Sequence, residues 1–285
     1  MKRVVLVTGS SRGLGRAFAH QVASEGDLAV VNSTGATDAG PRVVDEIRAA
    51  GGEAVHIAGA VESAADLVGA VVAECGRLDA VVHNAGFVRD KTLRKMSREQ
   101  WDAVLGVHLS AAFELSQAAW PHFVDAGGGR LVFISSASGL YGNFGQANYA
   151  AAKAGMYGLA RTIAYEGARE NIRANCVAPY GATEMNSGNL PDDFKARIKP
   201  EFIAPLVAYL TRADCEESGS LFEASAGWFK KVRLERSKGL RLDTQRPLSA
   251  DQIAAGWAQI TSFDETEHPA DMRESLSWMY ESDTP

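Results

Sequence analysis

Short apolar runs, rich in valine and isoleucine, alternate with longer segments of helical periodicity through most of the chain. This alternation is typical of βαβ units, in which helices cover a parallel sheet. It predicts strands at 3–7, 28–32, 54–57, 79–82, 130–135, 172–178 and 221–225. It predicts helices at 13–25, 41–50, 63–76, 98–124, 147–169 and 201–211. The expected fold is therefore α/β, a doubly wound, seven-stranded parallel sheet with helices on both faces.

The composition excludes several classes of protein. The chain has 285 residues, of which 46% are apolar and 22% charged, and these values are near those of soluble globular proteins. Its apolar runs are far shorter than the roughly 20 residues of a membrane-spanning helix. The net charge of −6 offers no overall positive field to a phosphate backbone. We therefore expect neither a membrane nor a nucleic acid as partner.

The cysteines and the chain ends indicate a cytoplasmic protein. Cys75, Cys176 and Cys215 lie without metal-ligand spacing and cannot all pair, so we expect neither a disulfide framework nor a metal site. Lys2 and Arg3 lead into an apolar run that is too short for the core of a signal peptide. The last four residues match no peroxisomal or retention signal.

The composition changes after residue 226. Residues 230–246 hold seven basic and two acidic side chains, and residues 251–283 hold eight acidic ones with Arg273 as the only lysine or arginine. We predict one cofactor-binding and catalytic domain over 1–226. Residues 227–285 form an extension that is not an independent domain, either a lid or an arm against a partner subunit. A solvated surface is the alternative explanation of both charged runs.

A glycine-rich turn follows the first predicted strand and precedes a helix. Its spacing, GxxxGxG, places glycines at Gly9, Gly13 and Gly15. Such a turn lets the backbone approach a pyrophosphate, whose charge is met by free N–H groups and the positive end of the helix. Glycines also serve ordinary turns, so the triplet alone is weak evidence. In this context it predicts a dinucleotide-binding Rossmann fold, with the cofactor held by Gly9, Ser11, Arg12, Gly13, Leu14 and Gly15.

Asn84, Ala85 and Gly86 end the fourth predicted strand. Open α/β sheets bind their ligands at this carboxyl edge, so we assign these residues to the cofactor site. A side chain of Asn84 that ties neighbouring segments together is the structural alternative, and it is compatible with a place in the site.

Three further side chains form a candidate catalytic group. Ser136 follows the fifth predicted strand, Tyr149 comes thirteen residues later, and Lys153 lies four residues beyond it. Positions four apart share one helix face, so phenol and ammonium can address one pocket. A nearby ammonium is expected to lower the phenol pKa from about 10, which makes Tyr149 a usable proton donor and acceptor. Ser136 would bind the substrate oxygen, and Lys153 can also hold the cofactor ribose.

Together these motifs resemble the short-chain dehydrogenase/reductase family over roughly residues 3–226. Residues 135–149, 106–109, 199–207 and 221–228 are similar to the (3R)-hydroxyacyl-CoA dehydrogenase unit of peroxisomal multifunctional enzymes. The resemblance implies an NAD(P)-dependent oxidoreductase that acts on 3-hydroxyacyl or 3-oxoacyl thioesters. A reductase of carrier-protein-linked 3-oxoacyl groups, a dehydrogenase of steroids or other secondary alcohols, and a non-catalytic cofactor sensor remain alternatives.

The resemblance also locates residues at which this chain departs from the family. His108 stands where many members carry an asparagine that holds a water of the proton relay, and a neutral imidazole can donate and accept in its place. A packed helical histidine is the alternative. Ala60 replaces an aspartate near the adenine, whereas Val61 is retained. Pro179 and Thr183, after the sixth predicted strand, are expected to approach the nicotinamide amide.

Two residues predict the choice of cofactor. The multifunctional enzymes place an aspartate just past the second strand to hold the adenosine ribose, and Ser33 stands there in this chain. Without that carboxylate a 2′-phosphate meets no repulsion, and Arg12 occupies a position where NADP-using relatives carry a basic residue. We expect a preference for NADP(H). The alternative is that Asn32 and Ser33 bind an unphosphorylated ribose and leave NAD(H) competitive.

The helices at 98–124 and 147–169 correspond to the dimerisation surface of the family. Their apolar positions exceed what one face against a sheet needs, as at Phe113, Met156, Leu159 and Ile163. We expect a homodimer or a dimer of dimers. In addition, Lys230, Lys231, Arg233 and Arg236 follow the seventh predicted strand, where they would guide the phosphates of a coenzyme A thioester; a surface or subunit contact is the alternative.

Overall fold

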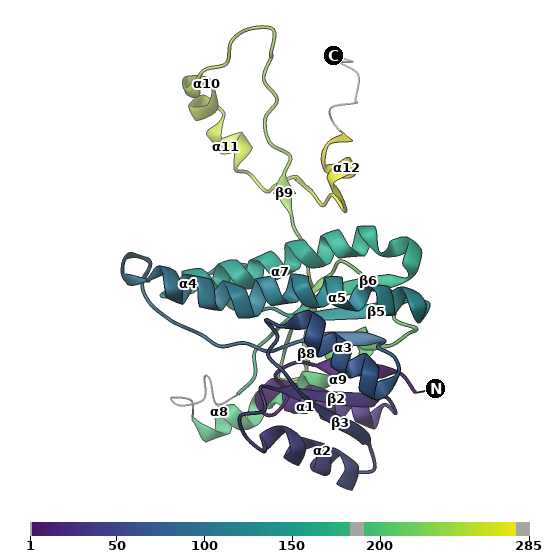
Figure 1. Cartoon of the computed structure of the whole chain (residues 1–285). Helices are drawn as coiled ribbons and strands as arrows, with labels where there is room; N and C mark the ends of the chain where they lie inside the picture. Colours follow the sequence, from purple (N-terminus) through teal and green to yellow (C-terminus); the bar gives the residue numbers. More distant parts are fainter. Residues whose placement is uncertain (1, 183–190, 278–285) are drawn as a thin grey trace. The chain divides into compact units, whose positions relative to one another are not determined.

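The computed structural model describes residues 2–182 and 191–277 of the chain. It forms two compact units, Met1–Lys231 and Val232–Pro285. The first unit is built on an eight-stranded sheet of order β3-β2-β1-β4-β5-β6-β7-β8 (Figure 1). Its strands are β1 Val4–Val7, β2 Leu28–Ser33, β3 Glu53–Ala58, β4 Ala80–His83, β5 Gly129–Ile134, β6 Ile172–Pro179, β7 Leu221–Ser225 and β8 Trp228–Val232.

The first seven strands are those predicted, and they pair in parallel. Leu6 of β1 pairs with Val30 of β2 on one side and with Val81 of β4 on the other. The strand order therefore reverses between β1 and β4. This is the point at which open α/β sheets form a crevice for a ligand.

The prediction of seven strands was wrong by one. Ala226 and Gly227 both have positive φ, 50° and 78°, which is the geometry of a two-residue hairpin turn. The chain therefore folds back after β7, and β8 adds an edge strand to the sheet. The extension predicted over 227–285 stays a prediction, and the compact first unit ends at Lys231, within this strand.

Helices cover both faces of the sheet, as predicted (Figure 1). One layer contains α1 Gly13–Ser24, α2 Ala39–Ala49 and α9 Ala204–Thr211, and the other contains α3 Ala64–Cys75, α5 Ala111–Asp125 and α7 Ala147–Glu166. Short helices that were not predicted are α6 Ala137–Tyr141 and α8 Asp192–Arg197. Single helical turns lie at η1 Leu93–Lys95, η3 Ala168–Glu170 and η5 Pro200–Phe202. No helix in the described part of the chain is long and apolar enough to cross a membrane.

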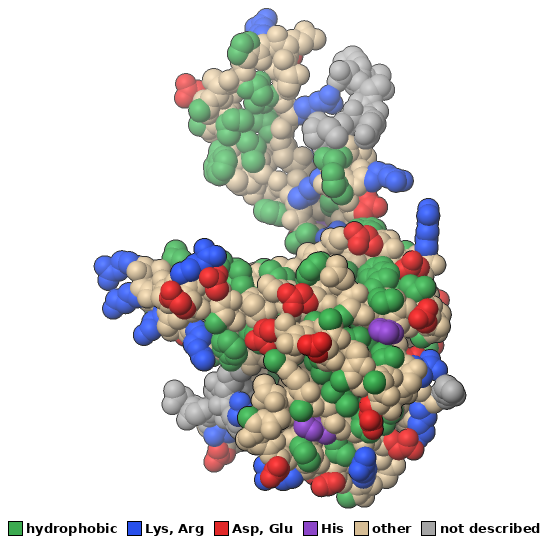
Figure 2. Space-filling model, viewed as in Figure 1, with side chains coloured by type: hydrophobic (Ala, Val, Ile, Leu, Met, Phe, Trp, Pro, Cys, Tyr) green, Lys and Arg blue, Asp and Glu red, His purple; other side chains and the backbone are tan. Residues whose placement is uncertain are grey.

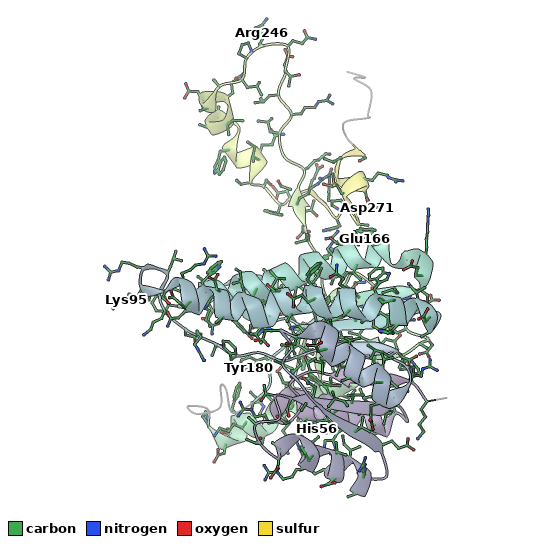
Figure 3. All side chains as sticks on the ribbon, viewed as in Figure 1. His56, Lys95, Glu166, Tyr180, Arg246 and Asp271 are labelled. Atoms are coloured by element: carbon green, nitrogen blue, oxygen red, sulfur yellow. The ribbon has the colours of Figure 1, made fainter. Side chains whose placement is uncertain are left out.

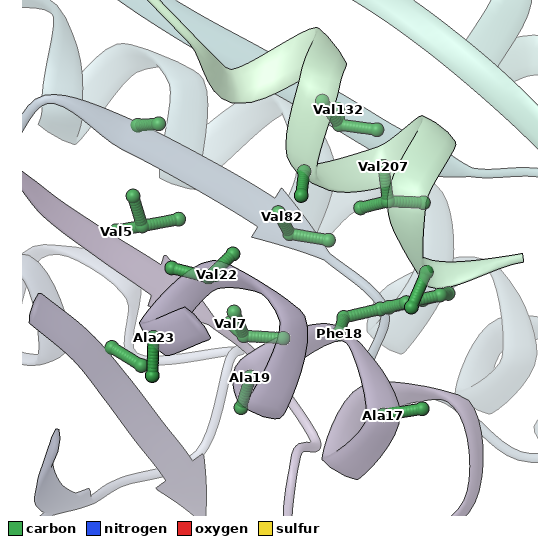
Figure 4. Close-up of a cluster of buried hydrophobic side chains, with 14 of the residues drawn as sticks. Val5, Val7, Ala17, Phe18, Ala19, Val22, Ala23, Val82, Val132 and Val207 are labelled. Carbon is green, nitrogen blue, oxygen red and sulfur yellow. The ribbon is translucent and has the colours of Figure 1, made fainter. Parts of the chain in front are cut away.

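The core follows from the alternation of side chains along buried strands. Val5 and Val7 of β1 point toward α1 and α9, where Phe18 is fully buried together with Val207 (Figure 4). Burying such an apolar side chain is worth roughly 1.5–3 kcal/mol. This layer fixes α1 against β1, and so it also fixes the glycine turn between them.

The single helix predicted over 98–124 is interrupted. It begins as α4 Arg98–Leu105, continues as a π-helical segment, η2 Gly106–Ser110, and resumes as α5. The N–H of Ala111 reaches back five residues to the carbonyl of Gly106, the pattern that defines a π-bulge. The bulge rotates the side chain of His108 relative to a regular helix, and π-bulges are frequent at functional sites.

The second unit, as far as residue 277, contains a two-stranded antiparallel ribbon and three short helices. These elements are β9 Arg236–Ser237, β10 Thr266–Glu267, α10 Ala250–Ala255, α11 Trp257–Ile260 and α12 Met272–Ser275. Arg236 pairs with Glu267 and Lys238 with Glu265, both at 2.6 Å. The basic and acidic runs seen in the sequence therefore partly neutralise each other within this unit.

Candidate active site

The glycine turn has the geometry that requires glycine. Gly9 and Gly13 have φ of 61° and 55°, in the left-handed region that L side chains rarely adopt. A Cβ on Gly9 would lie 2.7 Å from the Cα of Ala85, and one on Gly15 would lie 2.4 Å from the carbonyl oxygen of Gly9. Glycine is therefore required both for the left-handed backbone of the turn and for the short distances between the turn and neighbouring backbone.

Helix α1 begins within this motif, at Gly13, and its N-cap residue Arg12 makes no side-chain capping bond to the N–H groups of the first turn. These groups and the positive end of the helix form a site that suits a pyrophosphate. Ser11, Gly13 and Leu14 are half-buried, and Arg12, which precedes the helix, is exposed. The residues present fit the phosphates of a dinucleotide.

Asn84 both ties segments together and lines the site. Its side-chain amide donates to the carbonyls of Thr8 and Gly9, each at 3.1 Å. The backbone N–H groups of Asn84 and Ala85 donate to the hydroxyl of Thr8, each at 3.0 Å. The structural alternative raised for Asn84 is therefore correct, and the bonds place Asn84 and Ala85 directly against the glycine turn.

A buried histidine that the sequence analysis did not single out extends this connection. Nδ1 of His83 lies 3.2 Å from the Thr8 hydroxyl, and its Nε2 lies 3.0 Å from the carbonyl oxygen of His108. Burial lowers the pKa of His83 to about 4, so its imidazole is neutral near pH 7. His83 thus links the glycine turn to the π-helical segment.

The three candidate catalytic residues come together at the carboxyl edge of the sheet. Ser136 follows β5 and caps α6, with its hydroxyl accepting from the N–H of Ser138 at 3.2 Å. Tyr149 and Lys153 lie one turn apart on α7, and Nζ of Lys153 is 5.4 Å from the centroid of the Tyr149 ring. The arrangement joins a hydroxyl, a phenol and an ammonium group in one region.

The electrostatics of the pair differ from the sequence prediction. Burial raises the pKa of Tyr149, and a hydrogen bond with Ser136 partly offsets this effect. Nζ of Lys153 donates to the carbonyl of Ile134, and burial lowers the pKa of Lys153 to about 7. The expected lowering of the Tyr149 pKa by Lys153 is therefore wrong for this structure, because burial has the largest effect on both groups.

His108 lies beside Tyr149. Their rings meet edge to face with centroids 5.2 Å apart. Nε2 of His108 lies 2.9 Å from the carbonyl oxygen of Phe87, and Nδ1 is buried with no hydrogen-bond partner among the described residues. Burial holds the pKa of His108 well below its usual value. His108 is therefore neutral, with Nε2–H as donor and Nδ1 as a vacant acceptor.

A side-chain network holds the loop before α7 against the segment after β4. Gln146 donates to Asp90 at 3.1 Å and accepts from Ser138 at 2.9 Å. Asn148 donates to the carbonyl of Arg89 at 3.3 Å. No role was predicted for Gln146 and Asn148, which lie close to Tyr149 in the chain and tie the start of its helix to these segments.

The predicted adenosine residues lie at the ends of β2 and β3. The Ser33 hydroxyl is 2.9 Å from Nε2 of His56, which Figure 3 labels. Asn32 is buried, and its side chain bonds to the backbone of Gly9, Ile57 and Gly59. Both side-chain N–H groups of Asn32 are therefore engaged within the protein. Val61 is buried and Ala60 is exposed.

Pro179 ends β6, and Tyr180, also labelled in Figure 3, follows it with 46% of its surface exposed. Tyr180 is an aromatic group at the carboxyl edge of the sheet that the sequence analysis did not assign. Thr183 lies outside the described residues.

One of the basic side chains after β7, Lys231, does not lie at the predicted substrate edge. Because β8 runs back along β7, Nζ of Lys231 pairs at 2.9 Å with Glu217, which precedes β7. Lys230 lies over the ring of Trp228. The prediction that these lysines lie at the substrate edge was therefore wrong for Lys231, which sits at the opposite edge.

A comparison with protein families decides the class of this site. The family model described as short chain dehydrogenase matches residues 3–193. The chain belongs to the short-chain dehydrogenase/reductase family. Together with the enzyme names of its relatives, the family makes the chain an oxidoreductase on a Rossmann-type sheet.

Individual relatives extend the match over nearly the whole chain. The peroxisomal multifunctional enzyme type 2 of Mus musculus is 42% identical over 98% of this chain, which spans 39% of the mouse protein. The structure of the full-length enzyme of that name from Drosophila melanogaster is similar with a TM-score of 0.86 and 39% identity, over 98% of this chain and 49% of the fly chain. A short chain dehydrogenase from Mycobacterium avium matches with a TM-score of 0.81 and 35% identity, over 90% of this chain and 94% of the other.

Proposed function

We propose that the chain is an NAD(P)-dependent oxidoreductase that interconverts 3-hydroxyacyl and 3-oxoacyl thioesters. The observation that carries this proposal is the Ser136, Tyr149 and Lys153 group beside a glycine turn that fits a dinucleotide. The similarity to multifunctional enzymes over nearly the whole chain supports a thioester as the substrate class.

A nicotinamide cofactor held at the glycine turn and beside Asn84 and Lys153 would supply or accept a hydride at C3 of the substrate. Ser136 donates a hydrogen bond to the substrate oxygen and orients it. Tyr149 gives its proton to that oxygen during reduction, or removes it during oxidation. Lys153, whose Nζ donates to the carbonyl of Ile134, would bind the cofactor ribose, and in its charged form it lies 5.4 Å from the centroid of the Tyr149 ring. His108, behind Tyr149, holds a water that returns the proton.

A basic loop beside the site supports a substrate with phosphate groups. Residues 89–98 contain five basic side chains and one acidic one, although the chain as a whole is acidic. Figure 2 shows basic side chains gathered there, and Figure 3 labels Lys95. Lys91, Arg94 and Lys95 are exposed and form no ion pair in the described part of the chain. The loop joins the active site through Asn148, the neighbour of Tyr149.

The decisive experiment follows the absorbance of reduced nicotinamide with a panel of 3-oxoacyl-CoA substrates that includes acetoacetyl-CoA. Turnover supports the proposal. Turnover with carrier-protein thioesters only, or with steroid ketones only, would assign one of the alternative substrates. Cofactor binding without turnover of any substrate would indicate a sensor.

For the cofactor we propose NADP(H) in preference to NAD(H), on the absence of a carboxylate at Ser33 and the presence of Arg12. Ratios of kcat/KM for the two cofactors, in the native chain and in Arg12→Ala, test this preference. A native preference for NAD(H), or a ratio that Arg12→Ala leaves unchanged, would refute it.

We further propose a homodimer or dimer of dimers, in which the extension serves as a lid or as an arm against the partner. Met156 and Ile163 are buried within the chain itself, so they do not form the proposed interface; Phe113, at 51% exposure, is available. Light scattering at micromolar concentration checks the assembly.

We propose a cytoplasmic location for this chain. The names of several relatives contain the word peroxisomal, so microscopy of the tagged chain should distinguish a cytoplasmic from a peroxisomal location.

A further inference from the structure

Ser33 and His56 form a hydrogen-bonded pair at the carboxyl end of β2. The Ser33 hydroxyl lies 2.9 Å from Nε2 of His56 on β3, and it accepts from the N–H of Gly35 at 3.4 Å. In dinucleotide-binding folds, the residue at about this distance from the glycine turn meets the 2′ position of the adenosine ribose. The pair therefore lies where a 2′-phosphate and a 2′-hydroxyl are told apart.

The donors and acceptors of Ser33 can be counted. A serine hydroxyl has one proton and two lone pairs. Gly35 occupies one lone pair, so His56 takes either the proton or the second lone pair. When Nε2 carries no proton, it accepts from Ser33, which then offers only a lone pair to a ligand. When Nε2 is protonated, it donates to Ser33, which then offers its O–H.

These two states suit different cofactors. A ribose 2′-hydroxyl can donate to a lone pair, whereas a phosphate oxygen near neutral pH accepts hydrogen bonds. A doubly protonated imidazole also places a positive charge beside the phosphate. The state of His56 thus favours one cofactor or the other through Ser33.

The surroundings of His56 leave room for its imidazole to be either the donor or the acceptor toward Ser33. Gly40, in the first turn of α2, has no side chain, and a Cβ there would lie 2.3 Å from Nε2 of His56 and 3.0 Å from the Ser33 hydroxyl. Burial is the cause that lowers the pKa of His56. The charged residues on the adjoining elements have other partners or are exposed. Glu53 pairs with Lys2, Glu46 pairs with Arg16 and His20, and the Arg48 guanidinium donates to the carbonyl of Ala54. Asp38, Arg42 and Asp45 are exposed.

We propose that His56 is a positioning residue that sets which hydrogen-bonding group Ser33 presents to the adenosine ribose, and thereby adjusts the preference between NADP and NAD. The proposal rests on the proposed function only in that the chain binds these cofactors at this site. Protonation of His56 favours NADP, so the ratio of NADP to NAD affinity rises as the pH falls.

Isothermal titration calorimetry with NADP⁺ and NAD⁺, without substrate, tests the proposal on the full chain between about pH 5 and pH 8, a range that includes the acid side toward which burial shifts the pKa of His56. We expect the affinity ratio of the native chain to exceed that of His56→Gln by about tenfold at the acid end, and the excess to shrink as the pH rises. The 2′-phosphate itself gains a proton near pH 6. This weakens NADP binding in every variant, so the comparison between variants isolates His56.

Three further variants sharpen the comparison. Ser33→Ala should abolish the pH-dependent excess, because His56 acts through this hydroxyl. Gly40→Ala should also reduce it, because the new methyl group displaces the imidazole, and this variant keeps the test open should His56→Gln fold poorly. His122→Gln, on α5, is the matched control and should behave as the native chain does.

Equal pH trends in the native chain and in His56→Gln would overturn the proposal, as would a native trend that persists in Ser33→Ala. Cofactor binding with the expected trend but without thioester turnover would refute the proposed function and leave this inference standing. A chain that binds neither cofactor would refute both.

Discussion

The imidazole of His108 meets the phenol ring of Tyr149 edge to face, with 5.2 Å between the ring centroids and 84° between the ring planes. The contact exists because a π-helical turn interrupts the helix that carries His108, and because Nε2 of His108 lies against the carbonyl of Phe87. The segment after β4 and the π-helical segment η2 thus place His108 against the ring of Tyr149. A regular helix over these residues would direct His108 differently.

Tyr149→Phe removes the oxygen that transfers the proton and leaves the ring in contact with His108. We expect turnover to fall by about 10²–10⁴-fold, the usual contribution of a general acid or base. Cofactor affinity should change little, because the glycine turn is untouched. Steady-state kinetics and calorimetric titration of the cofactor measure the two effects. Residual activity above about a tenth of the native value would contradict the assignment of Tyr149.

Lys153 is 2% exposed, and burial lowers its pKa from 10.5 to about 7. The unfolded chain therefore binds a proton more readily than the folded one between pH 7 and 10.5, so burial of Lys153 costs stability that is greatest below pH 7. We expect Lys153→Met to lose activity and yet to melt at a higher temperature than the native chain, by about 2–5 °C at pH 6. The difference should shrink as the pH rises above 7. A lower melting temperature at every pH would show that the bond to Ile134 outweighs burial.

His83 should contribute to acid unfolding. Its pKa is lowered from 6.5 to about 4 by burial, so the unfolded chain takes up the proton first, and stability falls as the pH drops from 6.5 toward 4. The loss from this group is about 3 kcal/mol at the acid end. His83→Asn, which keeps a polar group between Thr8 and the His108 carbonyl, should flatten this part of the profile. Urea unfolding at a series of pH values measures it, and identical slopes for the two proteins would exclude His83.

The sequence predicted those features that depend on local pattern. Apolar runs predicted seven of the strands. The spacing of the glycines predicted the turn, because left-handed backbone at Gly9 and Gly13 and close backbone contacts at Gly9 and Gly15 require glycine there. Ser136, Tyr149 and Lys153 meet because strand ends and one helix face bring them together, which spacing alone indicates. The strands and the glycine turn have their physical cause within a few residues, whereas Ser136 meets Tyr149, thirteen residues later, because α7 packs against β5.

The features that the sequence analysis missed depend on contacts between distant segments. The bond between Ser33 and His56 needs the register of β2 against β3, and the link from Thr8 through His83 to His108 joins three separate elements. The raised pKa of Tyr149 reflects burial, which the pair of residues at four-residue spacing does not reveal. The hairpin that returns Lys231 to Glu217 depends on Ala226, an alanine with positive φ that carries no sequence signal for a turn.

The basic loop of residues 89–98 should bind the phosphates of a coenzyme A thioester. Arg94 and Lys95 are exposed on η1, whereas Arg98 pairs with Asp102 and the guanidinium of Arg89 lies 4.6 Å from the centroid of the Phe87 ring. Reversal of two charges, in the double variant Arg94→Glu and Lys95→Glu, should raise the KM for acetoacetyl-CoA by about tenfold. The KM for the pantetheine analogue, which lacks the nucleotide phosphates, should stay near the native value.

The matched control is the double variant Lys230→Glu and Lys231→Glu, which makes the same change of charge on β8. Because β8 carries Lys231 to the edge opposite the active site, this variant should leave the KM of both substrates unchanged. Added salt should raise the KM for the CoA ester of the native chain, since exposed charges are screened beyond about 8–10 Å at physiological ionic strength. Equal effects of the 94/95 variant on the CoA ester and on its pantetheine analogue would show that the loop acts on the fold of the site and not on phosphate.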